Sequence, residues 1–556
     1  MIVRRTDTCR QIVCLGPGRS MDPRQLATRF VPALFEDEHY LVVNKPAGLQ
    51  AAPTGLGESG GVDLLASLCG SPALHLTRPL EQHVSGVLVL AKSPEAAARL
   101  ANLLESRRPQ TEYVAVVRGQ VKGSRSFPKA GGQRRPAQWE GIVVRRRKDL
   151  SLLRFRHEAR RSSEIRAYLQ SLGLVALGDA RRKPGVSRRR PGGRLFLHRT
   201  RVEFRHPYTS KTVTVTAPMP PVFNAALGAA DLIEDSLHVA LASRLACLLN
   251  PQTDALRLIG ARGEGVPGLV AEKLGPVIVL QTHQGKFVGD LDRVRRIARF
   301  YSRLFDASAV YHKRFLKNRS QAEADAPELY DPHPLLGNPC PEEILVAENS
   351  LRFAVRPYDG YSTGLFLDQR DNRRRVRELA AGRRVLNTFA YTCTFSVAAA
   401  AGQAASTVSV DVSKKALEWG KRNFAANGLD LRGHTFICSD VFDYLKRARR
   451  QERAFDLIIL DPPSFSRAKR PKRVFSFIAD LQRLLIEALS VLAPGGTVLL
   501  STNNRTRSAA WLGEQIAAAA AQAGRRCRIT ATPPLPADFA PDRDYAKSLI
   551  ARFPQP

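Results

Sequence analysis

The amino-acid sequence predicts an α/β protein whose C-terminal third forms a doubly wound parallel sheet. Short apolar runs, which are typical of buried strands, occur at 384–391, 406–411, 434–440, 455–463 and 496–502. Asn387, Asp411, Asp440 and Asp461 lie within or at the ends of successive runs, 24, 29 and 21 residues apart. A strand, a crossover helix and the next parallel strand need about that length of chain. The spacing therefore predicts parallel strands with helices on both faces of the sheet.

Helical and strand patterns in the rest of the chain support a mixed architecture. Residues 414–428 have a helical pattern that ends on Asn427–Gly428, a pair typical of a helix C-terminus. Alternating apolar and polar residues predict a strand at 197–206, and an apolar run predicts another at 277–283. A basic helix is expected near 287–305.

Length and pattern together predict several domains, because 556 residues correspond to three or four domains of about 150 residues each. The expected divisions are a disordered extension at 1–29, an α+β unit at 30–225, a small α+β unit with a linker at 226–350 and the doubly wound unit at 351–556. The first 20 residues carry charges but no apolar core of the kind a secretory signal needs. We expect them to contribute nothing to function.

The charge of the chain indicates a polyanionic partner. Its 85 Lys and Arg exceed its 51 Asp and Glu by 34, which favours nucleic acid or an anionic surface. Residues 101–210 hold 27 of the basic and 8 of the acidic residues, more than half of the excess. The basic clusters there are Arg134–Arg135, Arg145–Lys148, Arg181–Lys183 and Arg188–Arg190. No run of 18 apolar residues predicts a membrane span.

The eight cysteines are scattered through the chain without a C-x-x-C pair or a Cys/His cluster. This distribution predicts neither a disulfide framework nor a metal site, and it is typical of a protein of the reducing cytoplasm.

The polar residues at the predicted strand ends form the candidate site. In an open α/β sheet, ligands bind beyond the carboxyl ends of the strands. Asp411 ends the second strand, where a carboxylate can accept hydrogen bonds from both hydroxyls of a ribose, and Asp440 could accept one from an adenine amino group. The first turn, 387–396, lacks the G-x-G-x-x-G of a diphosphate site. The pattern therefore favours a nucleoside cofactor without phosphates.

Several motifs of this region resemble one known family. The segments 361–374, 385–402, 409–430, 440–445 and 461–470 are similar to the class I S-adenosylmethionine-dependent methyltransferases that modify large-subunit rRNA, the RlmI/RlmK-like group. Residues 253–275 also resemble the small domain that precedes the catalytic domain in that group. The resemblance implies S-adenosyl-L-methionine as cofactor and a Rossmann-like catalytic sheet.

The same resemblance implies the roles of individual residues. The cofactor-binding set that it implies is Gln369, Asn387, Phe389, Tyr391, Asp411, Asp440 and Asp461. The implied catalytic set is Asp461, Pro462, Ser464 and Phe465, with Phe465 a candidate to stack on the target base.

The target atom is predicted from the residues after the fifth strand. Methylation of cytosine C5 needs a thiolate that attacks C6, and relatives with that activity place a cysteine there. This chain has 501–505, Ser-Thr-Asn-Asn-Arg, which resembles the guanine-methylating members. Cys393 and Cys438 are interpreted as small packed residues. We therefore expect a guanine nitrogen as target, with cytosine C5 as the alternative.

The N-terminal unit resembles the RluA-type pseudouridine synthases in the segments 35–49, 84–93, 111–121, 164–179 and 197–209. Arg78-Pro79-Leu80-Glu81 stands where the family has His-Arg-Leu-Asp, and Tyr113 and Arg166 match the base-packing aromatic and the basic partner of the catalytic carboxylate. Glu81 is one methylene longer than Asp, and a displacement of about 1 Å can reduce a rate by roughly 100-fold. We expect this degenerate site to bind RNA without isomerising uridine.

Together these features predict a cytoplasmic rRNA methyltransferase with an RNA-binding, pseudouridine-synthase-like domain. Two alternatives remain open at this point: a bifunctional enzyme in which Glu81 is active, and a non-catalytic RNA-binding factor of ribosome assembly.

Overall fold

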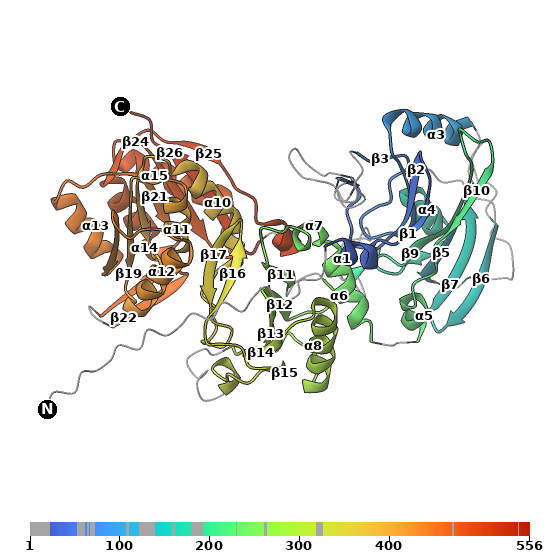
Figure 1. Ribbon diagram of the computed structural model, residues 1–556, viewed down its shortest axis with the longest axis horizontal. Helices are drawn as coiled ribbons and strands as arrows, with labels where there is room; N and C mark the ends of the chain where they lie inside the picture. Colours follow the sequence, from blue (N-terminus) through green and yellow to red (C-terminus); the bar gives the residue numbers. More distant parts are fainter. Residues whose placement is uncertain are drawn as a thin grey trace.

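The computed structural model describes residues 23–52, 62–63, 66, 73–106, 110–119, 121, 140–157, 162–179, 193–228, 231–260, 264–317, 326–469, 472–542 and 544–555. The first 22 residues and the clusters Arg134–Arg135, Arg181–Lys183 and Arg188–Arg190 lie outside the described residues. Three larger sheets follow one another along the molecule, the N-terminal one at the right of Figure 1 and the C-terminal one at the left. No helix in the described ranges has the length and apolar character to cross a membrane.

The N-terminal part is a ten-stranded sheet in the order β1-β2-β4-β9-β5-β7-β6, with β3, β8 and β10 pairing beside this path. Its strands are β1 (Ala33–Glu36), β2 (Tyr40–Lys45), β3 (His75–Leu76), β4 (Ser85–Ala91), β5 (Gln110–Arg118), β6 (Glu140–Arg147), β7 (Leu150–His157), β8 (Val175–Ala176), β9 (Leu197–Arg205) and β10 (Thr212–Thr216). Its helices are α1 (Pro23–Phe30), α3 (Pro94–Ser106), α4 (Ser162–Ser171) and α5 (Val222–Leu227). Successive residues of β2 and β4 pack alternately with α3 on one face and α4 on the other.

Helix α1 differs from the expectation for the N-terminal extension. It begins at Pro23, inside the part expected to be disordered. Leu26 and Phe30 are 4% and 7% exposed and pack in the same core as the central domain. Burial of these two side chains explains why this segment is helical.

The central part is a five-stranded sheet in the order β11-β12-β13-β14-β15. Its strands are β11 (Ala255–Ile259), β12 (Leu269–Leu274), β13 (Val277–His283), β14 (Ala309–Phe315) and β15 (Leu336–Gly337). Its helices are α6 (Ile233–Ala242), α7 (Leu245–Leu248), α8 (Leu291–Phe305) and the short η3 (Pro327–Leu329). Leu237 of α6, Leu256 of β11 and Ile297 of α8 share one apolar core with Leu88 of the N-terminal sheet. The two parts are therefore packed together.

The C-terminal part is a seven-stranded sheet in the order β20-β19-β18-β21-β24-β26-β25, preceded by the hairpin β16 (Ile344–Glu348) and β17 (Leu351–Val355). Its strands are β18 (Arg384–Thr388), β19 (Ser406–Asp411), β20 (His434–Cys438), β21 (Phe455–Leu460), β24 (Leu492–Thr502), β25 (Arg528–Ala531) and β26 (Lys547–Arg552). A second hairpin follows β21, made by β22 (Phe465–Lys469) and β23 (Lys472–Ser476). The remaining elements are η4 (Leu367–Gln369), α10 (Arg370–Leu379), α11 (Thr394–Ala401), α12 (Lys414–Ala426), α13 (Val441–Arg450), α14 (Phe477–Leu489), α15 (Ala509–Gln522) and η5 (Ala537–Asp542).

This sheet confirms the predicted doubly wound architecture. Strands β20, β19, β18, β21 and β24 are parallel, and β26 inserts antiparallel to β24. Leu386 and Ile458 pack toward α13, α14 and α15, whereas Val385 and Leu457 pack toward α10 and α11. The strand order reverses between β18 and β21, so the carboxyl ends of these strands meet at a switch point, the place where such sheets bind ligands.

Candidate functional site

The turn after β18 has an unusual backbone. Phe389, Tyr391 and Cys393 have φ values of 52°, 47° and 58°, so three residues with side chains lie in the left-handed region. Such conformations cost of order 1–3 kcal/mol each and cluster at ligand sites. The Tyr391 N–H donates to the Asp411 Oδ2 at 2.8 Å, which holds the turn against the end of β19.

Asp411 is the carboxylate around which this turn is organised. Its Oδ1 accepts from the Ser413 N–H at 2.8 Å, and its Oδ2 accepts from Tyr391. Burial raises the pKa of Asp411, and the backbone hydrogen bonds oppose that rise. Each carboxylate oxygen can accept about two hydrogen bonds. Asp411 can therefore hold the turn and also bind a pair of hydroxyls.

Aromatic side chains surround the turn. The Tyr391 hydroxyl donates to the Ser362 Oγ at 3.1 Å, and its ring centroid lies 5.6 Å from that of Phe366, which is 48% exposed. Gly364 has φ +99°, and a Cβ there would lie 2.3 Å from the Trp419 ring. Only glycine lets the 361–366 loop approach this close.

Two residues expected to bind a cofactor also have structural partners in the described structure, and their cofactor role stays a prediction. Asp440 caps α13, where its Oδ1 accepts from the N–H groups of Phe442 at 2.9 Å and Asp443 at 3.3 Å. Asn387 is 1% exposed and donates to the Ser396 Oγ at 2.9 Å, which ties β18 to α11. Phe389 lies beside the switch point, with its ring centroid 5.2 Å from that of Phe475.

Asp461 lies directly after β21 at the centre of a polar network. The Gln369 Nε2 donates to the Asp461 Oδ1 at 3.3 Å and to the Ser501 Oγ at 2.6 Å. Burial and the charge of Asp368 raise the pKa of Asp461 to about 7, and a hydrogen bond with Ser501 opposes that rise. The Asp461 carboxyl group therefore changes its protonation state near neutral pH.

Sequence reasoning missed three members of this network. Asp368 is 8% exposed, and burial raises its pKa. The Asn372 Nδ2 donates to the Gln369 Oε1 at 2.6 Å and to the Ser548 Oγ at 2.7 Å. Ser548 comes from β26, 176 residues away along the chain. The one signal in the sequence was the segment 361–374, which already contained Asp368 and Asn372.

The loop after Asp461 leads into the β22–β23 hairpin. Pro462 is buried, and the Ser464 hydroxyl donates to the Asn503 Oδ1 at 2.8 Å. Phe465 begins β22 and is 53% exposed. The structure thus brings Gln369, Asp461 and Ser501 into hydrogen-bonding contact, and about half of the Phe465 side chain is exposed beside them.

Two of the three N-terminal candidate residues, Glu81 and Arg166, meet at a separate cavity of about 250 Å³, which Gln82, His83 and Asp179 also line. The Arg166 Nη2 lies 2.7 Å from both carboxylate oxygens of Glu81, and its Nη1 donates to the Asp179 Oδ1 at 3.2 Å. Tyr113 is 2% exposed and stacks on Phe155, with ring centroids 6.0 Å apart. Glu81 and Arg166 thus form a pair at the cavity, and Tyr113 is packed in the core.

Comparison with known proteins decides the family. The family model for S-adenosylmethionine-dependent methyltransferases matches residues 258–552. The chain belongs to this methyltransferase family. It is 34% identical over 326 residues to a ribosomal RNA large subunit methyltransferase of Deinococcus radiodurans, which covers 57% of this chain and 78% of that protein. It is 43% identical over 165 residues to the ribosomal RNA large subunit methyltransferase K of Neisseria meningitidis, which covers 30% of this chain and 47% of that protein.

Solved structures and a second family model complete the comparison. The methyltransferase SMU.776, crystallised with SAH, matches this methyltransferase with a TM-score of 0.51 and 27% identity over 64% of this chain and 88% of that one. The model for RNA pseudouridylate synthases matches residues 39–171. The methyltransferase therefore carries a pseudouridine-synthase-type domain before its catalytic part.

The cofactor of the methyltransferase is S-adenosylmethionine, and the residues of the site fit this molecule. Asp411 offers carboxylate lone pairs that suit ribose hydroxyls. Asp368 and Asp461, side by side in the site, suit the positive charge of a sulfonium group. When bound, S-adenosylmethionine supplies a methyl group that is already activated for transfer, so the protein has to align the acceptor atom with it.

Proposed function

We propose that this methyltransferase modifies a guanine nitrogen of large-subunit rRNA. The observation that carries the proposal is the polar edge formed where β21 and β24 end. Asp461 follows β21, and Ser501, Thr502 and Asn503 end β24 or follow it, with no cysteine among them. A ring nitrogen is nucleophilic without a covalent enzyme adduct, so this edge has the groups that such a reaction needs.

The chain's own residues have distinct tasks in this reaction. Asp461 as carboxylate accepts a hydrogen bond from the base, and Gln369, fixed by Ser501, keeps that carboxylate oriented. Phe465 stacks on the target base after that base has been turned out of the RNA helix. Alignment of reacting groups of this kind can lower a barrier by on the order of 7–11 kcal/mol.

The raised pKa of Cys393 and the position of Cys438 in the sheet disfavour cytosine C5 as the target. Burial raises the pKa of Cys393 to about 12, so its thiolate is scarce at neutral pH. Cys438 is exposed, but it ends β20, beyond β18 and β19 in the sheet order from β21 and Asp461.

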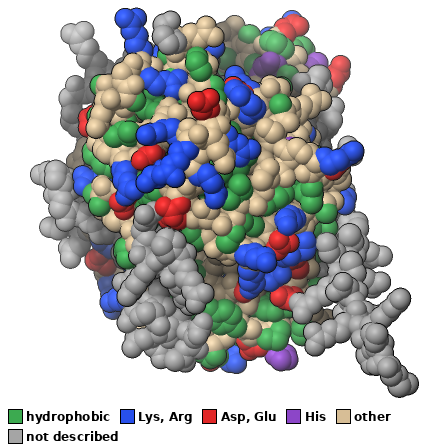
Figure 2. Space-filling model, turned by 90° about the vertical axis from the view of Figure 1, so that its left-hand side faces the viewer, with side chains coloured by type: hydrophobic (Ala, Val, Ile, Leu, Met, Phe, Trp, Pro, Cys, Tyr) green, Lys and Arg blue, Asp and Glu red, His purple; other side chains and the backbone are tan. Residues whose placement is uncertain are grey.

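RNA as partner is supported by the charge of the surface. Figure 2 shows Lys and Arg side chains gathered on the end of the molecule formed by the C-terminal sheet. Helix α13, at the left of Figure 1, carries four exposed basic residues, Lys446, Arg447, Arg449 and Arg450. The relatives described above are named as ribosomal RNA large subunit methyltransferases. Large-subunit rRNA is the polyanion that accounts for both observations.

The N-terminal domain is proposed to bind RNA without forming pseudouridine. Both oxygens of Glu81 are engaged by Arg166 at 2.7 Å, so the longer carboxylate is drawn toward its partner. To test this, pseudouridine is mapped in unmodified rRNA after incubation with the protein and with the variant Glu81→Ala. We expect identical maps, and a site lost with Glu81→Ala would show an active synthase and a bifunctional enzyme.

The methyltransferase activity is tested with cofactor titration and RNA analysis. We expect S-adenosylhomocysteine to bind in calorimetry, and Asp411→Ala to weaken it by about 10- to 100-fold, because hydrogen bonds to a charged group contribute about 1.5–3 kcal/mol. Asp430→Ala is the matched control, since Asp430 is exposed and pairs with Arg432. Asp461→Ala should abolish methyl transfer and leave RNA binding intact.

Mass spectrometry of rRNA nucleosides from cells lacking the protein identifies the target. Loss of one methylguanine would support the proposal. Loss of 5-methylcytosine would instead show that the target is cytosine C5. If calorimetry detects no cofactor binding and the rRNA of these cells lacks no methyl group, the protein is a non-catalytic RNA-binding factor.

A further inference from the structure

Helix α8 presents a row of arginines on one face. Arg296, Arg299 and Arg303 are spaced by three and four residues, so they lie on the same side of the helix, and all are exposed. The opposite side, with Val294, Ile297, Ala298 and Tyr301, is buried in the core. The arginine face is therefore not needed to pack the helix.

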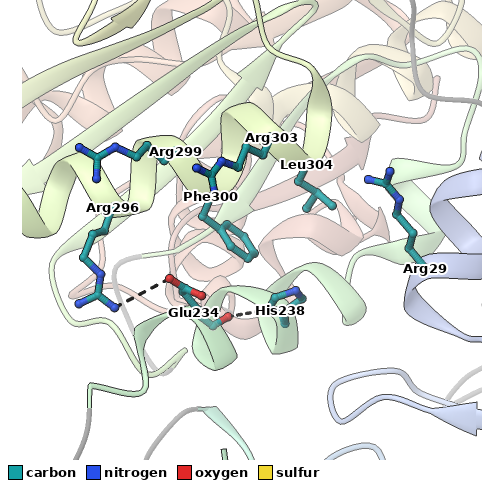
Figure 3. A pocket seen from close by; sticks show the side chains of 8 residues that line it. All are labelled: Arg29, Glu234, His238, Arg296, Arg299, Phe300, Arg303 and Leu304. Atoms are coloured by element: carbon teal, nitrogen blue, oxygen red, sulfur yellow. Dashed lines mark hydrogen bonds and ion pairs between the residues drawn. The ribbon is translucent and has the colours of Figure 1, made fainter. Parts of the chain in front are cut away.

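These arginines line a cavity of about 430 Å³ between three helices. Figure 3 shows α8 above α6, with Arg29 of α1 reaching into the same space from the N-terminal domain. Phe300 of α8 and His238 of α6 form an aromatic floor, with ring centroids 4.8 Å apart. The cavity thus has a basic rim and an aromatic base, and it lies where the N-terminal and central parts meet.

Most of the positive charge in the cavity has no carboxylate partner among the residues that the structure describes. Arg296 pairs with Asp231 at 3.2 Å and with Glu234 at 3.8 Å. Within the described ranges of the chain, no ion pair is found for Arg29, Arg299 or Arg303. These three side chains are exposed, so an anion can reach their guanidinium groups from the solvent.

We propose that this cavity binds the phosphodiester backbone of the rRNA. The proposal rests on the proposed function, because it assigns to that substrate a contact outside the catalytic edge. Arginines one helical turn apart, opposed by Arg29 on another domain, suit consecutive phosphates, and the aromatic floor suits an unstacked base. Bound there, the RNA contacts α1 of the N-terminal part and α8 of the central part at once.

Fluorescence anisotropy with labelled, unmodified 23S rRNA transcripts tests the proposal on the full chain. The test variants are the double variant Arg299→Gln/Arg303→Gln and the single variant Arg29→Gln. The matched control is Arg295→Gln, because Arg295 is on the same helix, does not line the cavity and pairs with Asp292 at 3.1 Å. Each affinity is measured over a series of salt concentrations.

We expect the double variant to weaken binding about 10-fold or more and to reduce the slope of log K against log salt by on the order of 1.5, since each lost phosphate contact removes about 0.7–0.9. Arg29→Gln should reduce the slope by about half as much. Arg295→Gln should leave it nearly unchanged. Equal slopes for the double variant, the control and the wild type would overturn the proposal.

Two further measurements separate this proposal from the function on which it rests. Unchanged affinity for S-adenosylhomocysteine shows that the variants are folded at the catalytic part. If methyl transfer to rRNA proceeds and the slopes do not change, the cavity proposal alone fails. If no rRNA preparation accepts a methyl group, the proposed function fails, whatever the slopes show.

Discussion

Burial and a neighbouring acid raise the pKa of the Asp461 carboxyl group at the catalytic edge. Its pKa rises to about 7 because water is excluded and because Asp368 lies beside it. A carboxyl group with a raised pKa in the folded state destabilises the fold once it ionises. The site therefore stores an unfavourable charge that the positive sulfonium of its cofactor can offset.

This charge predicts a pH-dependent effect of Asp461→Asn on stability. The unfolded carboxyl ionises near pH 3.8 and the folded one near pH 7, so the wild type loses stability as pH rises between these values. The asparagine variant has no such loss. We expect its stability advantage, measured by thermal unfolding without cofactor, to grow by about 2 kcal/mol from pH 5 to pH 8. A difference that stays constant with pH would contradict the raised pKa.

At the same scale, sequence spacing located residues better than it assigned their partners. It placed Asp411, Asp440 and Asp461 near the carboxyl ends of strands, and all three lie there. It could not tell a ligand-binding carboxylate from a helix cap, because both follow a strand and precede a helix. The Oδ1 of Asp440 accepts from two backbone N–H groups of α13, so Asp440 caps the helix, and its contact with a cofactor stays a prediction.

At the scale of elements, the parallel strands were predictable and β26 was not. Strands β18, β19 and β21 have compact apolar runs separated by crossover lengths. Strand β26 inserts antiparallel between β24 and β25, and its contribution of Ser548 to the site follows from tertiary pairing alone. Likewise, the cavity at α8 depends on how α6 and α8 of the central part and α1 of the N-terminal part come together.

The β22–β23 hairpin is the element that we expect to receive the base. Phe465 is 53% exposed at its start, next to the Asp461 loop. Stacking of a base on an aromatic side chain contributes about 1–3 kcal/mol. We expect Phe465→Ala to lower methyl transfer to rRNA about 10-fold or more and to leave cofactor affinity unchanged.

The matched control for the hairpin is Leu431→Ala. Leu431 is 42% exposed and lies before β20, at the opposite edge of the sheet from the strand ends. Tritium transfer from labelled S-adenosylmethionine measures both variants. Equal rates for the two variants would mean that Phe465 does not hold the base.

At the scale of the whole molecule, one residue, Asp538, joins three other segments of the chain through its carboxylate and its backbone carbonyl. Asp538 is 0% exposed, and its carboxylate pairs with Arg370 of α10 at 2.8 Å. It also accepts from the Arg257 N–H of β11 at 2.8 Å, and its carbonyl accepts from the Arg244 Nε at 2.9 Å. Since Arg370 follows Gln369, this contact fixes the central domain against the residue that holds Asp461.

Asp538→Ala should therefore lower both stability and catalysis. Removal of Asp538 leaves the buried Arg370 guanidinium with the more distant carboxylate of Glu348 at 3.8 Å, so the cost approaches the about 3–5 kcal/mol of a broken buried pair. Asp456→Ala is the control, because its pair with Arg384 at 3.0 Å is half exposed and such pairs contribute at most about 1 kcal/mol. Differential scanning calorimetry of the cofactor-free protein measures the loss of stability, and single-turnover methyl transfer measures the catalytic effect.

Because Gln369 loses its anchored neighbour, we expect the rate of methyl transfer to fall for Asp538→Ala and not for Asp456→Ala. A similar small shift in both variants would show that the domains are held by their apolar core alone.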